Sequence, residues 1–137
     1  MNQARILASL RREVRERAEE RCEYCLLPEL QAVLPHEPDH LIALKHGGRT
    51  TSENLALACF ECNRFKGSDI ASIDAITGEL VSLFNPRRQR WFEHFRLNGA
   101  QIIPLTPVGR VTDKLLRLNL PSRVEVRRQL VAQARYP

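Results

Sequence analysis

Two short cysteine pairs, Cys22-Glu-Tyr-Cys25 and Cys59-Phe-Glu-Cys62, decide how this chain folds. They contain all four cysteines of the 137-residue sequence. The two-residue spacing lets both thiols of a pair point inward from one turn, and two such pairs make a tetrahedral Cys₄ zinc site. A redox dithiol needs only one pair in a βα setting that is missing here, and disulfides are disfavoured in a cytosolic chain. The sequence therefore predicts structural Zn²⁺ held by Cys22, Cys25, Cys59 and Cys62.

The segment between the pairs carries the candidate chemistry. A closed Cys₄ site has no open coordination position, so it stabilises the fold and does no chemistry itself. Zinc binding would enclose the 33 residues from Leu26 to Ala58, and three of the four histidines lie between residues 36 and 46 of that segment. We expect Asp39-His40 and Asn63, which follows the second pair, to face each other across a small cleft.

The order of these residues resembles the signature of the HNH endonuclease family, which has an Asp-His on a strand, a central Asn, and a final His or Asn at a helix start. The matching stretches are Asp39-His40-Leu-Ile42, His46-Gly-Gly48, Asn54-Leu55 and Cys62-Asn-Arg-Phe-Lys-Gly67. Many family members frame this motif with two cysteine pairs. The resemblance implies that residues 22–69 form a ββα-metal (His-Me finger) core, stapled by zinc, with metal-dependent DNA endonuclease activity.

The resemblance also implies a role for each motif residue. His40 would be the general base, because an ordinary pKa near ~6.5 suits proton uptake at neutral pH. Asp39 and Asn63 would hold a divalent ion through oxygen, which favours Mg²⁺ or Mn²⁺. Asn54 would tie the loop after the strand to the backbone that positions His40. The products implied are 5′-phosphate and 3′-hydroxyl ends.

The charge is distributed unevenly along the chain. The formal net charge is +5, made up of +2 in residues 1–21, −5 in residues 22–84 and +8 in residues 85–137. Eighteen of the 21 basic residues are arginine, whose planar fork suits phosphate oxygens, although a solvated basic surface gives the same composition. The expected DNA contacts are Arg64 and Lys66 beside the last ligand and Arg87, Arg88, Arg90 and Arg96 beyond it, with Arg127 and Arg128 as outer contacts.

The flanking sequence predicts a single α+β domain over residues 1–137. An amphipathic helix within residues 1–21 places Ile6, Leu10, Val14 and Ala18 on one stripe. The runs at 31–34 and 40–44 suit two short strands or one strand and an irregular loop. Pro38 lacks a backbone donor, so the first strand should pair late or lie at a sheet edge. A helix at 59–66 should end at Gly67.

Residues 70–137 predict a basic extension of hairpins and helices. Thr77-Gly78 predicts a hairpin, Asn98-Gly99 predicts a second turn, and Thr106-Pro107 predicts a helix start. The last helix should begin at a capping box, Ser122-x-x-Glu125, and bury a stripe of Val126, Leu130 and Ala134. His36 and His46 are expected in loops and His94 in the core, without an assigned function.

Composition limits the function classes. The chain is 43% hydrophobic and 27% charged, as globular proteins are, and no apolar stretch approaches the ~20 residues of a membrane span. The first residues contain no apolar signal-peptide region, so a cytoplasmic protein without a membrane partner is expected. The leading hypothesis is a DNA endonuclease. The alternative is a zinc-stapled nucleic-acid-binding module without catalytic activity.

Overall fold

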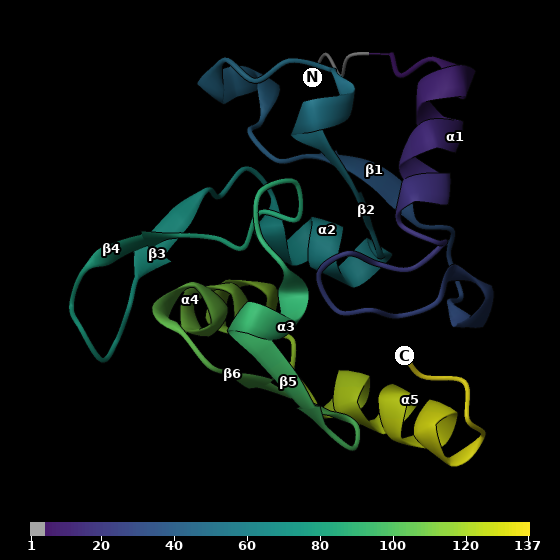
Figure 1. The fold of residues 1–137 in the computed structure, drawn as a ribbon, viewed down its shortest axis with the longest axis vertical. Coiled ribbons are helices and arrows are strands. Elements are labelled where there is room, and N and C mark those ends of the chain that lie inside the picture. Colours follow the sequence, from purple (N-terminus) through teal and green to yellow (C-terminus); the bar gives the residue numbers. More distant parts are fainter. Residues whose placement is uncertain (1–4) are drawn as a thin grey trace.

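A computed structural model describes residues 5–137, in which five α-helices combine with three two-stranded antiparallel sheets (Figure 1). This confirms the predicted α+β class. The helices are α1 (Ala8–Arg17), α2 (Phe60–Lys66), α3 (Trp91–His94), α4 (Pro107–Leu116) and α5 (Pro121–Ala132). The strand pairs are β1 (Glu37–His40) with β2 (Leu55–Ala58), β3 (Ala71–Ile73) with β4 (Leu80–Ser82), and β5 (Phe95–Asn98) with β6 (Gln101–Pro104).

The centre of the fold is a ββα unit. β1 pairs antiparallel with β2, so that His40 lies opposite Leu55 and Asp39 opposite Ala56. α2 packs against both strands and starts at Cys59, whose Sγ accepts a hydrogen bond from the Cys62 backbone N–H at 3.4 Å. Gly67 ends α2 with φ +53°, a left-handed value that favours glycine. This is the arrangement that the resemblance implies.

The predicted positions of the first strands were partly wrong. Residues 31–34 form no strand, and the Val33 side chain is fully exposed at 101%. The true strand is β1, three residues earlier than the predicted 40–44, because it pairs with β2, whose four residues are all buried. Pro38 lies in this two-stranded sheet, where each strand has a free edge, as its missing N–H requires.

The N-terminal helix covers β2. Val14 is buried together with Leu55 and Leu57, and Ile6, Leu10 and Ala18 pack around them. This confirms the predicted apolar stripe.

The extension folds largely as its turn residues predict. β3–β4 is the expected hairpin, and the expected turn at Asn98-Gly99 joins β5 to β6 in a second one. The Thr106 hydroxyl caps α4 by accepting from the Gly109 N–H at 3.1 Å. The predicted start of α5 was wrong, because Ser122 lies inside its first turn and caps nothing. Its predicted stripe was right only for Leu130. Val126 and Ala134 are exposed, and the buried face contains Arg123, Val124, Arg127 and Leu130.

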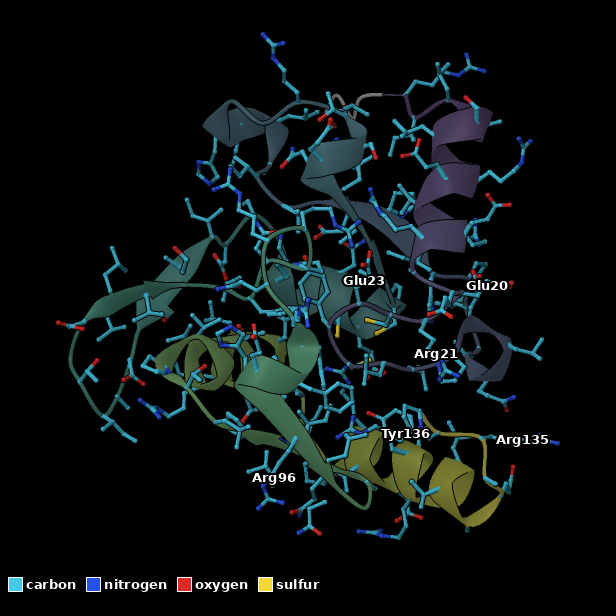
Figure 2. All side chains as sticks on the ribbon, in the orientation of Figure 1. Glu20, Arg21, Glu23, Arg96, Arg135 and Tyr136 are labelled. Atoms are coloured by element: carbon cyan, nitrogen blue, oxygen red, sulfur yellow. The ribbon has the colours of Figure 1, made fainter. Side chains whose placement is uncertain are left out.

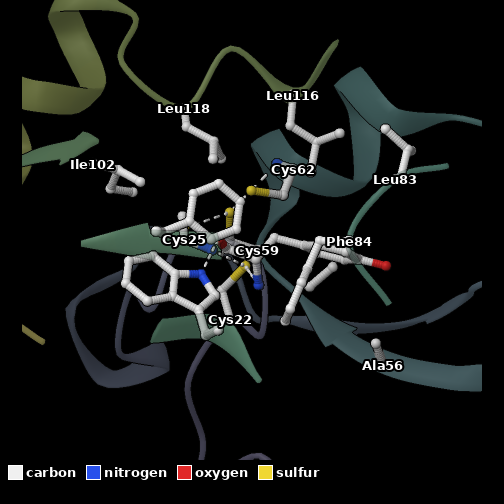
Figure 3. Packing of buried hydrophobic residues seen from close by; sticks show 14 of the residues in the cluster. Cys22, Cys25, Ala56, Cys59, Cys62, Leu83, Phe84, Ile102, Leu116 and Leu118 are labelled. Atoms are coloured by element: carbon white, nitrogen blue, oxygen red, sulfur yellow. Dashed lines mark hydrogen bonds between the residues drawn. The ribbon is translucent and has the colours of Figure 1, made fainter. Parts of the chain in front are cut away.

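The main hydrophobic cluster surrounds the cysteines (Figure 3). Its buried residues from the extension include Phe84, Trp91, Phe95, Ile102, Val111, Leu116 and Leu118. Two hydrogen bonds join the extension to the first cysteine pair, from Trp91 Nε1 to the Tyr24 carbonyl at 2.9 Å and from the Tyr136 hydroxyl to the Cys25 carbonyl at 2.7 Å. The extension and the ββα unit therefore share one core. Within residues 5–137, no helix has the length and apolar character to cross a membrane.

Candidate functional site

The four cysteines form a buried cluster. Their Sγ atoms all lie within 4.8 Å of one another, and Cys25 Sγ is 3.7 Å from Cys59 Sγ. A tetrahedron with Zn–S bonds of about 2.3 Å has S–S edges of about 3.8 Å, so the donor set fits zinc. The backbone N–H groups of Tyr24 and Cys25 point at Cys22 Sγ, each at 3.4 Å. The cluster is therefore compatible with a structural metal such as zinc. It is the only such group of His, Cys, Asp or Glu ligands in the described part of the chain.

A buried arginine completes the surroundings of this cluster. Arg123 in α5 is 4% exposed, and its Nη2 donates to Cys62 Sγ at 3.0 Å and to Cys59 Sγ at 3.6 Å. Four thiolates around Zn²⁺ carry a net charge near −2, and one guanidinium offsets part of that charge. The sequence pattern did not reveal Arg123, although the expected negative charge was a reason to look for a buried cation.

Asp39 is held by two partners. Its Oδ2 accepts from the Tyr24 hydroxyl at 3.0 Å and lies 3.2 Å from Lys66 Nζ. Lys66 also donates to the His40 carbonyl at 3.0 Å, so it fixes both residues of the Asp-His pair. Burial raises the pKa of Asp39, and the nearby ammonium opposes that rise. Burial and then the Asp39 charge raise the pKa of Tyr24, which keeps its hydroxyl protonated as a donor.

Lys66 is therefore not a free phosphate contact, and that prediction was wrong. Its side chain is 3% exposed, beside Asp39 at 6%, because the last turn of α2 packs against β1. Asn63 lies one turn earlier on the same face of α2 and is half-buried. The contacts of Asp39 within residues 5–137 use only Oδ2, which leaves Oδ1 for a ligand. Carboxylate and amide oxygens suit a hard divalent cation, so Asp39 and Asn63 fit Mg²⁺ or Mn²⁺.

His40 stands at the end of β1, half-buried, and is oriented by one side chain. Its Nε2 lies 2.9 Å from Thr50 Oγ1, and its Nδ1 has no hydrogen-bond partner among the described residues. Burial lowers the pKa of His40, although the Asp39 charge partly opposes this effect. The ring is therefore neutral at pH 7 and can accept a proton. Nothing in the sequence spacing pointed to Thr50.

Asn54 organises the loop between β1 and β2, residues 41–54. Its Oδ1 accepts from the Ile42 N–H at 2.9 Å, and its Nδ2 donates to the carbonyls of Ile42 at 3.0 Å and Arg49 at 2.7 Å. Gly48 permits this closure, since a Cβ there would lie 1.8 Å from the Ile42 carbonyl oxygen. Asn54 thus fixes the backbone on both sides of the loop that carries Thr50.

Comparison with known proteins supports this geometry. Residues 22–69 match the family model described as HNH endonuclease. These residues form an HNH domain. The resemblance read from the sequence is thereby confirmed, and the domain indicates a nuclease-type function on nucleic acid. None of the curated proteins and none of the solved structures matches the chain.

The arginines around the HNH domain differ in availability. Arg87 was expected on DNA, but it forms an ion pair with Glu23 and donates to the Leu55 carbonyl at 3.2 Å. Arg127 is not an outer contact either, since it is buried and its Nε donates to the Ala100 carbonyl at 2.8 Å. Figure 2 shows Arg96 on β5, at the opposite end of the molecule from α1. The exposed members of the predicted set are Arg64, Arg88, Arg90, Arg96 and Arg128, the last of which pairs with Glu125.

Within residues 5–137, no hydrogen bond joins the other three histidines to Asp39 or His40. His36 is fully buried, and its Nε2 lies 2.8 Å from the Leu27 carbonyl oxygen. His94 bonds through Nδ1 to Thr106 Oγ1 at 2.6 Å, as a packed residue does. His46 is exposed in the 3₁₀ turn Leu44–His46.

Proposed function

We propose that this protein is a metal-dependent endonuclease that hydrolyses DNA phosphodiester bonds. The observation that carries the proposal is the arrangement of His40, whose Nε2 lies 2.9 Å from Thr50 Oγ1 while Nδ1 has no hydrogen-bond partner in residues 5–137. Beside it, Asp39 keeps one free carboxylate oxygen on the face of β1 that α2 covers. A module that only binds nucleic acid has no need for an oriented base next to a buried carboxylate.

The divalent ion is assigned to Asp39 and Asn63. When bound, Mg²⁺ or Mn²⁺ supplies a positive charge for the phosphate oxygens and for the leaving 3′ oxygen. The protein's own part is to hold the carboxylate of Asp39 in place, through Tyr24 and Lys66, so that Oδ1 stays available. Only two protein ligands are assigned, which suits Mg²⁺ because it keeps several waters and substrate oxygens.

His40 moves the proton. Nε2–H donates to Thr50 Oγ1, and Nδ1 accepts a proton from the attacking water. The water oxygen forms the new bond to phosphorus while the bond from phosphorus to the 3′ oxygen breaks. The leaving oxygen then takes up a proton from solvent. The expected products are 5′-phosphate and 3′-hydroxyl ends.

Substrate contacts are assigned to three exposed arginines. Arg64 follows Asn63 directly on α2, and Arg88 and Arg90 lie in the turn before α3. Arg87 anchors that turn to the HNH domain through Glu23 and the Leu55 carbonyl. We therefore expect its neighbours, rather than Arg87 itself, to contact phosphates.

The test is cleavage of supercoiled, linear, branched and single-stranded DNA with Mg²⁺ or Mn²⁺, followed by mapping of the ends. His40→Ala should reduce cleavage at least ~100-fold, the lower range for a general base. His46→Ala, which removes an exposed histidine outside the site, is the matched control and should cleave as wild type. Zinc content and circular dichroism must be equal in all three proteins. DNA binding without cleavage in any metal would favour the zinc-stapled binding module instead.

A further inference from the structure

The cysteine cluster is contacted by a residue from the far end of the chain. Arg123 approaches Cys62 and Cys59 with the same nitrogen, Nη2, at 3.0 and 3.6 Å. Its Nη1 donates to the carbonyls of Leu116 at 2.7 Å and Arg117 at 3.2 Å, at the end of α4. The guanidinium therefore joins the second cysteine pair, α4 and α5 at one buried point.

The charges around Arg123 favour the cluster as its main partner. The one carboxylate that forms an ion pair with it among the described residues is Glu61, whose Oε1 lies 3.8 Å from Nε and whose side chain is 44% exposed. A weak, half-solvated contact of this kind contributes little. Asp113 interacts with the Arg123 charge but forms no ion pair with it. A buried cation without a close anion is costly, and the thiolates supply the buried negative charge that Arg123 needs.

We propose that Arg123 is a functional part of the metal site, which neutralises the metal–thiolate cluster and couples retention of the metal to the docking of α5. Free-energy coupling between two events is reciprocal. If the guanidinium strengthens metal binding, then the bound metal strengthens the packing of α5 by the same amount. Helix α5 then packs fully against the HNH domain only when the metal is bound.

This coupling does not depend on the proposed nuclease activity. It concerns the structural metal alone, and its readouts are metal affinity and local protection of the backbone. Arg128 offers a matched control, because it lies on the same helix as Arg123 but is exposed and pairs with Glu125. Arg123→Met keeps the length and apolar stem of the side chain and removes only the charge and the donors.

The experiment uses the full-length, zinc-loaded protein. Zinc affinity is measured by competition with a chromogenic chelator for wild type, Arg123→Met, Arg123→Lys and Arg128→Met. Loss of an outer-shell partner typically costs ~10–100-fold in metal affinity, and we expect this loss for Arg123→Met and a smaller one for Arg123→Lys. Arg128→Met should stay within about twofold of wild type, as expected for an exposed pair.

Hydrogen exchange of the same zinc-loaded proteins gives the second readout. Arg123→Met should exchange faster than wild type in α5, and it should leave α1 unchanged because that helix packs in a separate cluster. If Arg123→Met and Arg123→Lys both bind zinc as tightly as Arg128→Met, the proposal is overturned. It is also overturned if α5 keeps wild-type protection in both. Should Arg123→Met not fold, Arg123→Lys alone decides the outcome.

Discussion

In the part of the chain that the structure describes, Asp39 and the cysteine cluster each meet a buried cation from a helix. The two sites differ in whether a ligand atom is left without a partner. Lys66 of α2 holds Asp39, and Arg123 of α5 holds the thiolates of Cys59 and Cys62. At the cysteine cluster, all four donors face one another in the core. At the Asp39 site, one carboxylate oxygen stays without a partner among the described residues.

This difference follows from where the two sites lie. The cysteine cluster is surrounded by the largest group of apolar side chains, where an unsatisfied polar atom is costly. Asp39 lies at the end of β1, next to the half-buried His40 and the partly exposed loop 41–54. The residues beside Asp39 are thus partly exposed, whereas the four cysteines are buried. One site is suited to holding the fold together and the other to chemistry.

The largest effect on stability should follow from a substitution in the four-cysteine cluster. Cys59→Ser removes one thiolate from the cluster, while the serine hydroxyl can still accept from the Cys62 N–H and cap α2. Structural zinc contributes apparent binding free energies of ~10–16 kcal/mol in small zinc domains, so we expect loss of bound zinc and of the cooperative thermal transition. Zinc content by elemental mass spectrometry and thermal melts by circular dichroism test this. A variant with wild-type zinc content and an unchanged melt would contradict a structural Cys₄ site.

A smaller effect on stability should follow from removing Lys66, the cation beside Asp39. Lys66→Met leaves the Asp39 carboxylate buried without its ammonium partner, and breaking a buried pair of this kind costs ~3–5 kcal/mol. Urea unfolding measures the change. Lys45→Met, at an exposed lysine, is the control and should change stability by less than ~0.5 kcal/mol.

The double variant sharpens this prediction. Asp39→Asn combined with Lys66→Met removes both charges, so it should be more stable than Lys66→Met alone. Equal stability of the double and single variants would mean that the loss arises from packing of the lysine stem rather than from the unpaired charge.

The next effect concerns the orientation of His40. Thr50→Val removes the hydroxyl at 2.9 Å from Nε2 and keeps the shape of the side chain. We expect a fall in kcat of about tenfold with little change in KM, while Thr50→Ser should recover most of the rate, because misorientation of a base costs part of its ~100–10,000-fold contribution. ¹⁵N NMR of the His40 ring gives a readout independent of cleavage. Wild type and Thr50→Ser should share one tautomer, with the proton on Nε2, and Thr50→Val should show a mixture. An identical ring spectrum in all three proteins would contradict the assignment.

How far the sequence could predict these two sites depended on spacing. The cysteine pairs stand at a fixed spacing along the chain, so their meeting could be anticipated. The position of Asn54 likewise indicated that it ties the loop after β1 to the backbone. Arg123 and Thr50 could not be anticipated, because Arg123 lies 61 positions from Cys62 and Thr50 is one of several hydroxyl residues in its loop. Lys66 was predicted as a phosphate contact because a helix of seven residues is too short for its apolar pattern to show which face is buried. Which of its faces covers β1 is set by tertiary packing.

The same reason explains the misplaced strand and the face of α5. Apolar residues at 31–34 suggested a strand, yet burial is decided by which segment pairs with β2, and the polar Glu37–His40 does so. On α5, Arg127 was predicted as an outer DNA contact and the pattern did not single out Arg123, yet both lie on the buried face. Each arginine can be buried because another part of the chain supplies a hydrogen-bond acceptor. Arg123 donates to the Cys62 sulfur, and Arg127 donates to the Ala100 carbonyl.

The smallest expected effect concerns DNA binding by the exposed arginines in the turn before α3. Arg88→Gln and Arg90→Gln should each weaken DNA binding and lower the magnitude of the salt slope, by ~0.9 for each phosphate contact that is lost on duplex DNA. Arg96→Gln is the matched control, because Arg96 is equally exposed but lies on β5 at the opposite end of the molecule from α1 (Figure 2). Binding is followed by fluorescence anisotropy at several salt concentrations with Ca²⁺ replacing Mg²⁺, so that cleavage does not interfere. A salt slope that falls equally in all three variants would mean that charge acts from the whole surface. A slope that falls only for Arg88→Gln and Arg90→Gln would place the bound phosphates along the turn before α3. Arg87 holds that turn against the HNH domain, so the DNA would lie beside the domain that contains Asp39 and His40.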